Sequence, residues 1–457
     1  MTYVDSRGIE LTTASRASVE RYETALDLLA SYFLDPLATI ESALAEDPDF
    51  VSGHCLRAGI GVLAGERSAE PLIQESLREG ERLAAKASER ERRHFAAAKA
   101  WLDGDFHRAG ELYGRIVIDH PRDLLALVIA HVSDFYVGRT RMQRDRIAHV
   151  LPAWDESVPG YGYVLGMLAF GFEETNLFER ALDTARSALA LNPRDSWAVH
   201  AGAHVFEMTG RIPEGIEWLT TREADWAPNN TFAYHNYWHL ALYHLEAGDV
   251  RRGLELFDTR IYPRPSCIAL ELVDASALLF RLYLRGIDVG ERATSVADAW
   301  SNPVQHGFHV FSDVHAVMAL VIDGRLSEAR EIVRALERTA AEDGSNPDMV
   351  RQVGLPFARS VLAFAEGRYP AVVETLLPLR LVANHFGGSN AQRDVIEQLL
   401  IESAVRAGET RLARALLSER QLVRHESPWA RTVEHRLASG ARGRGREHAS
   451  RVESAAE

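Results

Sequence analysis

One helical element recurs along the chain and constrains the fold more than any other feature. Each copy has an apolar helix, a Gly or Asn that begins a tight turn, and a second, amphipathic helix. Gly and Asn adopt at low cost the left-handed conformation that ends a helix. The pattern predicts an all-α chain of stacked helix-turn-helix units. The turn residues of its seven copies are Gly104, Asn176, Gly210, Gly248, Gly324, Gly367 and Gly408.

The spacing inside the copies is also regular. Pro121 and Pro193 each stand 17 residues after a turn residue and end the second helix, and Pro48 does the same in an earlier, degenerate copy. A small side chain five residues after the turn lets the second helix lie close to the first. These features resemble the tetratricopeptide repeat, which implies a right-handed superhelical solenoid with a concave binding surface. The small residues are Ala109, Ala181, Gly215, Gly253, Ala329 and Ala413, with Val372 as the loosest match.

The repeat pattern also sets the expected boundaries. We expect an N-terminal extension over residues 1–20, the solenoid over 21–437, and a disordered tail over 438–457, where apolar periodicity is missing. Two intervals between turn residues are about twice as long as one repeat. Each should therefore contain a further, irregular helical pair, near residues 124–160 and 270–300.

Composition excludes several classes of partner. The chain has 457 residues and a net charge of -14, so its surface repels phosphate backbones and anionic membranes. The two cysteines have no metal-ligand spacing. Neither a signal-like N-terminus nor an apolar stretch of about 18 residues occurs, so we expect a cytoplasmic protein with no nucleic-acid or membrane partner. The oligomeric state, and whether the solenoid is open or closed, stay undetermined.

Several strings are similar to the tetratricopeptide repeat protein thirty-eight family. The most particular are HNYWH and GGSNAQRD, which repeat periodicity does not explain. The resemblance covers nearly the whole chain and implies a helical solenoid, but the family carries no settled activity. The other matching strings are FEETNLFERA, DSWAVHAGAHVFEM, HNYWHLALYHLEAGD, VDASALLFRL, DVHAVMAL, GLPFARS and GGSNAQRDVIEQLL.

Two adjacent first helices carry paired histidines. His200 and His204 are four residues apart and share one helix face, with Glu207 three residues further on. His235 and His239 form an equivalent pair on the next first helix. We therefore expect two neighbouring helices to present four imidazoles.

The distance to the turn glycine indicates which side chains face the groove. His200, His204 and Glu207 lie ten, six and three residues before Gly210. The resemblance to the tetratricopeptide repeat implies that these offsets, and that of His235, face the concave groove. His239 and His315 lie nine residues before their turn glycines, at a less groove-facing offset.

Three interpretations of the histidines stay open. The first is a divalent metal site, zinc or iron, with Glu207, Glu173 or Glu174 supplying oxygen; such an ion would act as a Lewis acid. No HExxH motif supports a metalloprotease. The second interpretation has neutral imidazoles acting as acid-base groups and hydrogen-bond donors to a polar ligand. The third has them joining packed helices through buried hydrogen bonds.

Other residues extend the candidate site. GGSNAQRD provides Ser389 and Asn390 as helix N-cap candidates, and a helix N-terminus there could hold an anion with help from Arg393. An ordinary capped loop explains the same string. Polar residues that could extend the lining are His131, Asp274, Asp313 and His315, and aromatic residues beside the histidines are Trp197, Tyr234, Tyr237 and Trp238.

Two functions compete, and a third, an assembly platform, has no specific support. The leading one is binding of a peptide or small polar ligand in the concave groove, with ligand-binding candidates His200, His204, Glu207, His235, His239, Trp238, His315 and Arg393. The alternative is an enzyme that acts on a small polar substrate, with His204, Glu207 and His239 as catalytic candidates. Its metal candidates, if it uses a metal, are His200, His204, His235 and His239.

Overall fold

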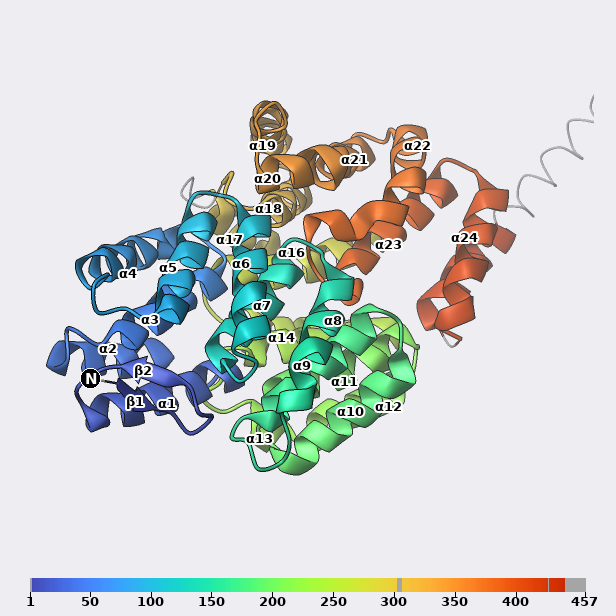
Figure 1. Cartoon of the computed structure of the whole chain (residues 1–457). Helices are drawn as coiled ribbons and strands as arrows, with labels where there is room; N and C mark the ends of the chain where they lie inside the picture. Colours follow the sequence, from blue (N-terminus) through green and yellow to red (C-terminus); the bar gives the residue numbers. More distant parts are fainter. Residues whose placement is uncertain (1, 302–305, 426, 440–457) are drawn as a thin grey trace, which may run out of the picture.

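The computed structural model describes residues 2–301, 306–425 and 427–439, and these residues are almost entirely helical (Figure 1). The two short strands, β1 (Thr2–Val4) and β2 (Glu10–Thr12), pair antiparallel at the N-terminus. The helices are α1 (Arg16–Ser31), α2 (Pro36–Glu46), α3 (Val51–Ala64), α4 (Glu70–Arg82), α5 (Glu89–Leu102), α6 (Phe106–Asp119), α7 (Leu124–Tyr136), α8 (Thr140–Val150), α9 (Tyr161–Glu174), α10 (Phe178–Leu191), α11 (Ser196–Met208), α12 (Ile212–Thr220), α13 (Glu223–Trp226), α14 (Ala233–Glu246), α15 (Val250–Leu256), α16 (Ala269–Leu284), α17 (Glu291–Trp300), α18 (Val310–Ile322), α19 (Leu326–Thr339), α20 (Ser345–Met349), α21 (Leu355–Ala365), α22 (Tyr369–Leu379), α23 (Asn390–Arg406) and α24 (Thr410–Val423).

Shorter helical segments extend or join these helices. Three are 3₁₀ turns, at Arg67–Ala69, Leu151–Ala153 and Arg380–Phe386. Two are π turns, at Phe257–Ile261 after α15 and at Val350–Gly354 between α20 and α21. A last helix covers residues 428–439.

The predicted solenoid of helix-turn-helix repeats is confirmed. All seven predicted turn residues have a positive φ, from 60° at Asn176 to 88° at Gly248. Gly138 and Gly286 adopt the same conformation, with φ of 66° and 74°. They end the first helices of the pairs α7–α8 and α16–α17, which fill the two long intervals. The extra pairs predicted near 124–160 and 270–300 are therefore present and have the same kind of turn as the other repeats.

Small residues at the predicted position leave room for side chains of neighbouring helices. Ala109, Ala181, Ala329 and Ala413 are fully buried at the predicted position. At Gly215 in α12, an added Cβ would lie only 2.4 Å from the ring of Tyr243 in α14. The requirement for a small residue at this position is thus steric, because a neighbouring ring already fills the space.

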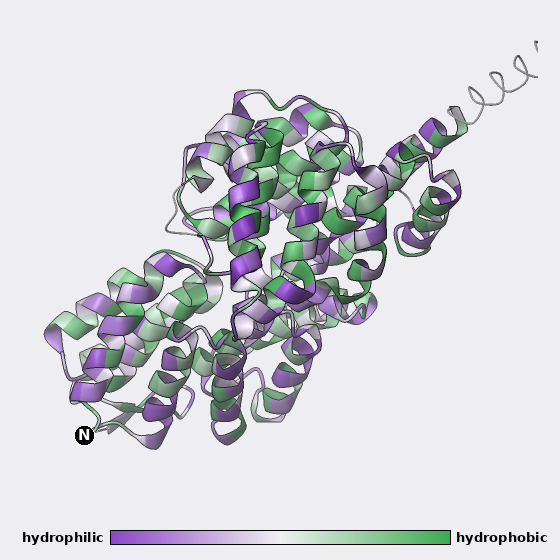
Figure 2. Ribbon diagram, turned by 90° about the horizontal axis from the view of Figure 1, so that it is seen from above, coloured by the Kyte–Doolittle hydropathy of each residue, from purple (hydrophilic) through white to green (hydrophobic). Residues whose placement is uncertain are grey.

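Segments from both ends of the chain return to the middle repeats. The strand-like residue Phe33 pairs with Asn230, and α23 packs against both α11 and α16. Hydrophobic and hydrophilic residues lie on different faces of many helices (Figure 2). The inward faces form one continuous buried core. Segments that are distant in the sequence therefore lie beside the middle repeats.

The structure describes most of the expected N-terminal extension but only the first two residues of the expected C-terminal tail. Residues 1–20 were expected as an extension; of these, the β1–β2 hairpin packs on α3 and α1 begins at Arg16. The final helix runs to residue 439, so residues 438 and 439 of the expected tail are helical, and 440–457 lie outside the described residues. In the described ranges, none of the helices has the length and apolarity needed to cross a membrane.

Candidate functional site

Four histidines from two adjacent helices converge in the interior. His200 and His204 lie on α11, and His235 and His239 lie on α14. The four side chains belong to residues that are 2%, 0%, 7% and 0% exposed, in the same order. One ring nitrogen from each lies within 4.8 Å of the others. We call these four residues the histidine cluster.

Three carboxylates contact the outer edge of the histidine cluster. Their contacts with Nδ1 are Glu173 to His204 at 3.1 Å, Asp274 to His235 at 2.6 Å, and Glu207 to His239 at 2.7 Å. An ionised carboxylate only accepts hydrogen bonds, so each of these Nδ1 atoms carries the hydrogen when its carboxylate is ionised. The Nε2 atoms of the three rings are then left with a free lone pair.

The inner nitrogens of the histidine cluster are poorly satisfied. His204 Nε2 and His239 Nε2 are buried and have no hydrogen-bond partner among the described residues. His200 Nε2 and His235 Nε2 are 3.0 Å apart, so one of them donates a hydrogen and the other accepts it. A buried polar atom without a partner costs about 1–3 kcal/mol. The centre of the cluster therefore has more lone pairs than hydrogens.

Burial sets the protonation of these rings. It lowers the pKa of His204 to about 4, and with the neighbouring imidazoles it holds the pKa of His200 and His239 well below the usual value. These three rings are thus neutral at pH 7. Burial also raises the pKa of Glu173 to about 7. A positive charge inside the cluster would favour the ionised form of this carboxylate.

The GGSNAQRD string forms the start of α23 beside Glu174. Ser389 caps the helix in a capping box with Gln392. The backbone N–H of Asn390 donates to Glu174 at 2.6 Å, and Arg393 pairs with the same carboxylate at 3.0 Å. The helix N-terminus considered for an anion thus holds a carboxylate of the chain itself. Arg393 pairs with Glu174 and makes no hydrogen bond to the histidine cluster.

The remaining candidates lie in different surroundings. Trp238 is buried and stacks on His235 with ring centres 5.4 Å apart. His315 donates to the carbonyl of Phe311 at 2.7 Å, and Asp313 accepts from the N–H of Gly307. His131 makes ring contacts with Phe170 and Trp197. Of the four polar residues considered as an extended lining, only Asp274 contacts the cluster.

A cavity adjoins the cluster on one side. It offers about 90 Å³ to the centres of water-sized molecules, and both His200 and His235 line it. Aromatic rings form much of its wall, and some of them, such as Tyr32 and Phe232, were not predicted from the repeat pattern. Tyr32 follows α1, and no sequence signal places it near residue 200. The aromatic lining residues are Tyr32, Phe135, Tyr136, Trp197, Phe232 and Tyr234.

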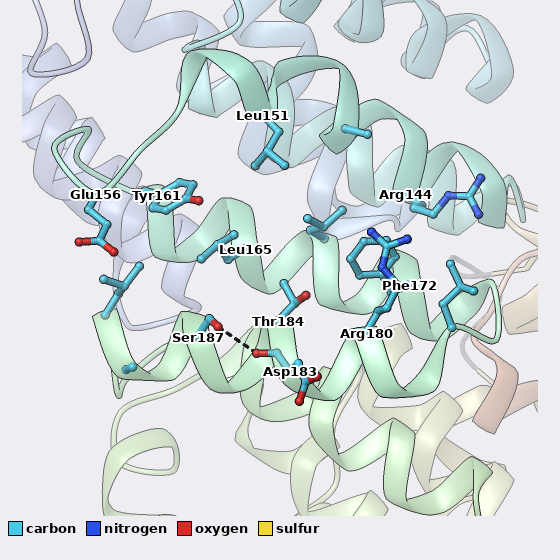
Figure 3. A pocket seen from close by; sticks show the side chains of 15 residues that line it. Arg144, Leu151, Glu156, Tyr161, Leu165, Phe172, Arg180, Asp183, Thr184 and Ser187 are labelled. Carbon is cyan, nitrogen blue, oxygen red and sulfur yellow. Dashed lines mark hydrogen bonds between the residues drawn. The ribbon is translucent and has the colours of Figure 1, made fainter.

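Two further pockets lie away from the cluster centre. The larger is an open pocket of about 920 Å³ between α8, α9 and α10, where apolar side chains such as Leu165 meet Arg144 and Arg180 (Figure 3). Arg180 lies 4.1 Å from the ring centre of Phe172. The other pocket, of about 480 Å³, is polar and includes Arg393. None of the histidines of the cluster lines either pocket.

No family model matches the chain. Among solved structures, it is similar to the APC/C hetero-tetramer Cut9-Hcn1, with 13% identity, 92% of this chain and 76% of that chain covered, and a TM-score of 0.42. It is similar to the human IFIT1 dimer with m7Gppp-AAAA, with 14% identity, 92% and 95% coverage, and a TM-score of 0.37. It is also similar to yeast Tom70, with 14% identity, 96% of this chain and 90% of that chain covered, and a TM-score of 0.31.

The tetratricopeptide-like architecture is confirmed by the helix pairs and turns of the chain itself. Membership of the tetratricopeptide repeat protein thirty-eight family stays a prediction. The site residues and their roles likewise stay predictions.

Proposed function

We propose that the protein is a metalloprotein that holds one divalent transition-metal ion on His200, His204, His235 and His239. The observation that carries this proposal is the pair of buried Nε2 atoms of His204 and His239. They have no partner among the described residues and lie within reach of the other two rings. A metal ion gives every one of these lone pairs a partner.

The geometry of the cluster is compatible with such an ion. Imidazole nitrogens bind zinc at about 2.0–2.1 Å, which separates tetrahedral ligands by roughly 3.4 Å. The four ring nitrogens lie within 4.8 Å of one another, so small side-chain adjustments suffice. Imidazole suits zinc, copper, iron and nickel, whereas magnesium and calcium prefer oxygen. We therefore expect one of the first group.

The outer carboxylates support the same conclusion. Histidines that bind metals usually donate their other ring N–H to a carboxylate or carbonyl, which fixes the ring and raises its basicity. Three of the four rings have such a partner, namely Glu173, Asp274 or Glu207. In a purely structural network we would expect the inner nitrogens to have partners as well. When ionised, these carboxylates also offset the positive charge of a divalent ion.

The adjoining cavity favours chemistry or binding at the ion over a purely structural metal. His200 and His235 belong both to the cluster and to the cavity wall, so a small molecule in the cavity would lie beside the ion. An ion there that takes an oxygen atom as a fifth ligand would act as a Lewis acid toward it. A peptide lying in an open groove is less well supported, because the four histidines are at most 7% exposed.

Elemental analysis tests the proposal. Untagged protein, prepared without chelator and reconstituted with zinc, iron, cobalt, nickel or copper, should retain close to one ion per chain after gel filtration. His239→Gln should lose the ion while its circular dichroism stays helical, and His149→Gln, at an exposed position, should retain it. If none of these metals remains bound to the folded wild-type chain, the proposal is wrong.

A further inference from the structure

The cavity beside the cluster is assembled from distant parts of the chain. Tyr32 follows α1, Trp197 begins α11, Leu270 lies in α16, and Ser389 and Gln392 come from the start of α23. A wall made of so many segments exists only in the complete solenoid. Its shape is therefore a property of the whole fold.

One wall of the cavity is a stack of aromatic rings. Tyr32 lies against Trp197 with ring centres 5.5 Å apart and an angle of 14° between the planes. Tyr32 also stacks on Phe232, with ring centres 4.8 Å apart and an angle of 29° between the planes. The stack holds these rings in place and presents apolar surface. Such a surface favours a flat or aliphatic body over a strongly hydrated one.

Two polar atoms on the lining residues have no partner in the described part of the chain. They are Nε1 of Trp197 and Nδ1 of His200, and both are buried. The indole nitrogen can only donate a hydrogen bond. When His200 Nε2 binds a metal ion, its Nδ1 also carries a hydrogen. Both atoms can then donate a hydrogen bond to an acceptor atom on the molecule that occupies the cavity.

The charges around the cavity argue against an anionic ligand. No Lys or Arg occurs among the described residues that line it. The acidic lining residue is Asp274, which is already bonded to His235 at 2.6 Å. Phosphates and carboxylates are usually held by Arg, Lys or helix N-termini, and the start of α23 is occupied by Glu174.

We propose that this cavity binds a small, uncharged molecule with an aromatic or aliphatic body and an oxygen acceptor. The oxygen accepts from Nδ1 of His200 and Nε1 of Trp197, and the body lies against Tyr32, Trp197 and Phe232. The hydrogen on His200 Nδ1 rests on the proposed metal site, whereas the apolar fit and the indole contact do not. The ligand class is therefore that of small amides, ketones or alcohols.

Ligand-observed NMR with three probes tests this proposal. Benzamide has the ring and the acceptor, toluene lacks the acceptor, and benzoate carries a charge. Each probe is titrated into reconstituted and metal-free full-length protein. We expect benzamide to bind both forms of the protein. Its affinity for the reconstituted form should exceed the affinities of the other two probes by roughly tenfold or more.

Cavity-filling variants locate the binding. Leu63→Phe and Leu270→Phe add volume at two separate places on the lining, so each should weaken benzamide binding at least roughly tenfold. Leu422→Phe, at a side chain that is 73% exposed and outside the cavity, should bind as the wild type does. Thermal melting identifies any variant that fails to fold. If one filling variant fails to fold, benzamide binding by the other one tests the location.

The outcomes separate the two proposals. Binding of benzamide by a protein that never retains metal supports the cavity and overturns the metal site. A protein that retains metal but binds none of the probes, or binds them equally well in the folded filling variants, overturns the cavity proposal alone. Preference for benzoate over benzamide also overturns the proposed ligand class.

Discussion

His239 in α14 donates its Nδ1 hydrogen to Glu207 in α11 at 2.7 Å, while its Nε2 has no partner among the described residues. Glu207 belongs to the same helix face as His200 and His204, one turn further along. A single helix face thus supplies two rings of the cluster and the carboxylate that orients a third. This relationship suggests that the carboxylates matter for metal affinity as well as for packing.

Glu207→Gln should weaken metal binding while leaving the fold intact. The amide oxygen can still accept the hydrogen from His239, but the negative charge is gone. Replacing an outer partner of a ligating histidine typically lowers metal affinity by about 10–100-fold. Competition with a chelator measures the affinity. Glu214→Gln, an exposed position on the neighbouring α12, serves as the control, and equal affinities in the two variants would contradict the role given to Glu207.

Metal should stabilise the wild type and have little effect on His204→Ala. An ion present at about 100 times its Kd adds about 2.7 kcal/mol to the free energy of unfolding. Urea unfolding with and without chelator measures this difference. In the metal-free state His204→Ala should change stability far less than in the loaded state. A variant that is equally destabilised in both states would indicate that the ring serves packing alone.

Gly215→Ala should destabilise the solenoid. Its Cβ would lie 2.4 Å from the ring of Tyr243, which is fully buried and whose hydroxyl donates to the carbonyl of Ala203. The ring cannot swing away, so overpacking should cost about 1–3 kcal/mol. Gly162→Ala in α9 is a matched control, since its nearest neighbour lies at 3.4 Å. Thermal unfolding of both variants compares the two sites, and equal melting temperatures would refute the steric requirement.

Acid should destabilise the protein in part through His309. This buried ring caps α18: Nδ1 accepts the N–H of Phe311, and Nε2 donates to the carbonyl of Tyr136 at 2.9 Å. Burial lowers the pKa of His309 to about 4. Because the unfolded pKa is about 6.5, the unfolded chain binds more protons between these values, and stability falls as pH drops below about 6.5.

The variant His309→Asn isolates that contribution. Asparagine also caps helices but does not titrate. Between pH 7.5 and 5 the wild type should lose about 2 kcal/mol more stability than the variant, as measured by urea unfolding at each pH. Parallel pH profiles for the two proteins would mean that His309 does not take part in the acid response.

The repeat could be predicted from sequence because its determinants are local. Positive φ at Gly104 or Asn176 and a small residue at Ala181 follow from the turn and from the packing of adjacent helices. The convergence of the four imidazoles also follows from local rules, since i, i+4 pairs on neighbouring helices face one another. Whether these imidazoles bind a metal ion stays a prediction.

The surroundings of the cluster could not be predicted in the same way. Tyr32 and Gln392 are 360 residues apart in sequence, yet both line the cavity, because the superhelix brings its ends to the middle repeats. Offsets from a turn glycine do not contain that information. For the same reason His315, at the same offset as His239, lies at a site where its partner is the carbonyl of Phe311.

X-ray absorption spectroscopy at the metal edge of the reconstituted wild-type protein shows whether the histidine cluster holds the ion. We expect a first shell of imidazole nitrogens at about 2.0–2.1 Å for zinc, with the multiple-scattering pattern of several histidine rings. The pattern should weaken in His239→Gln. A first shell made only of oxygen, or a spectrum unchanged by that substitution, would contradict a metal ion held by the histidine cluster.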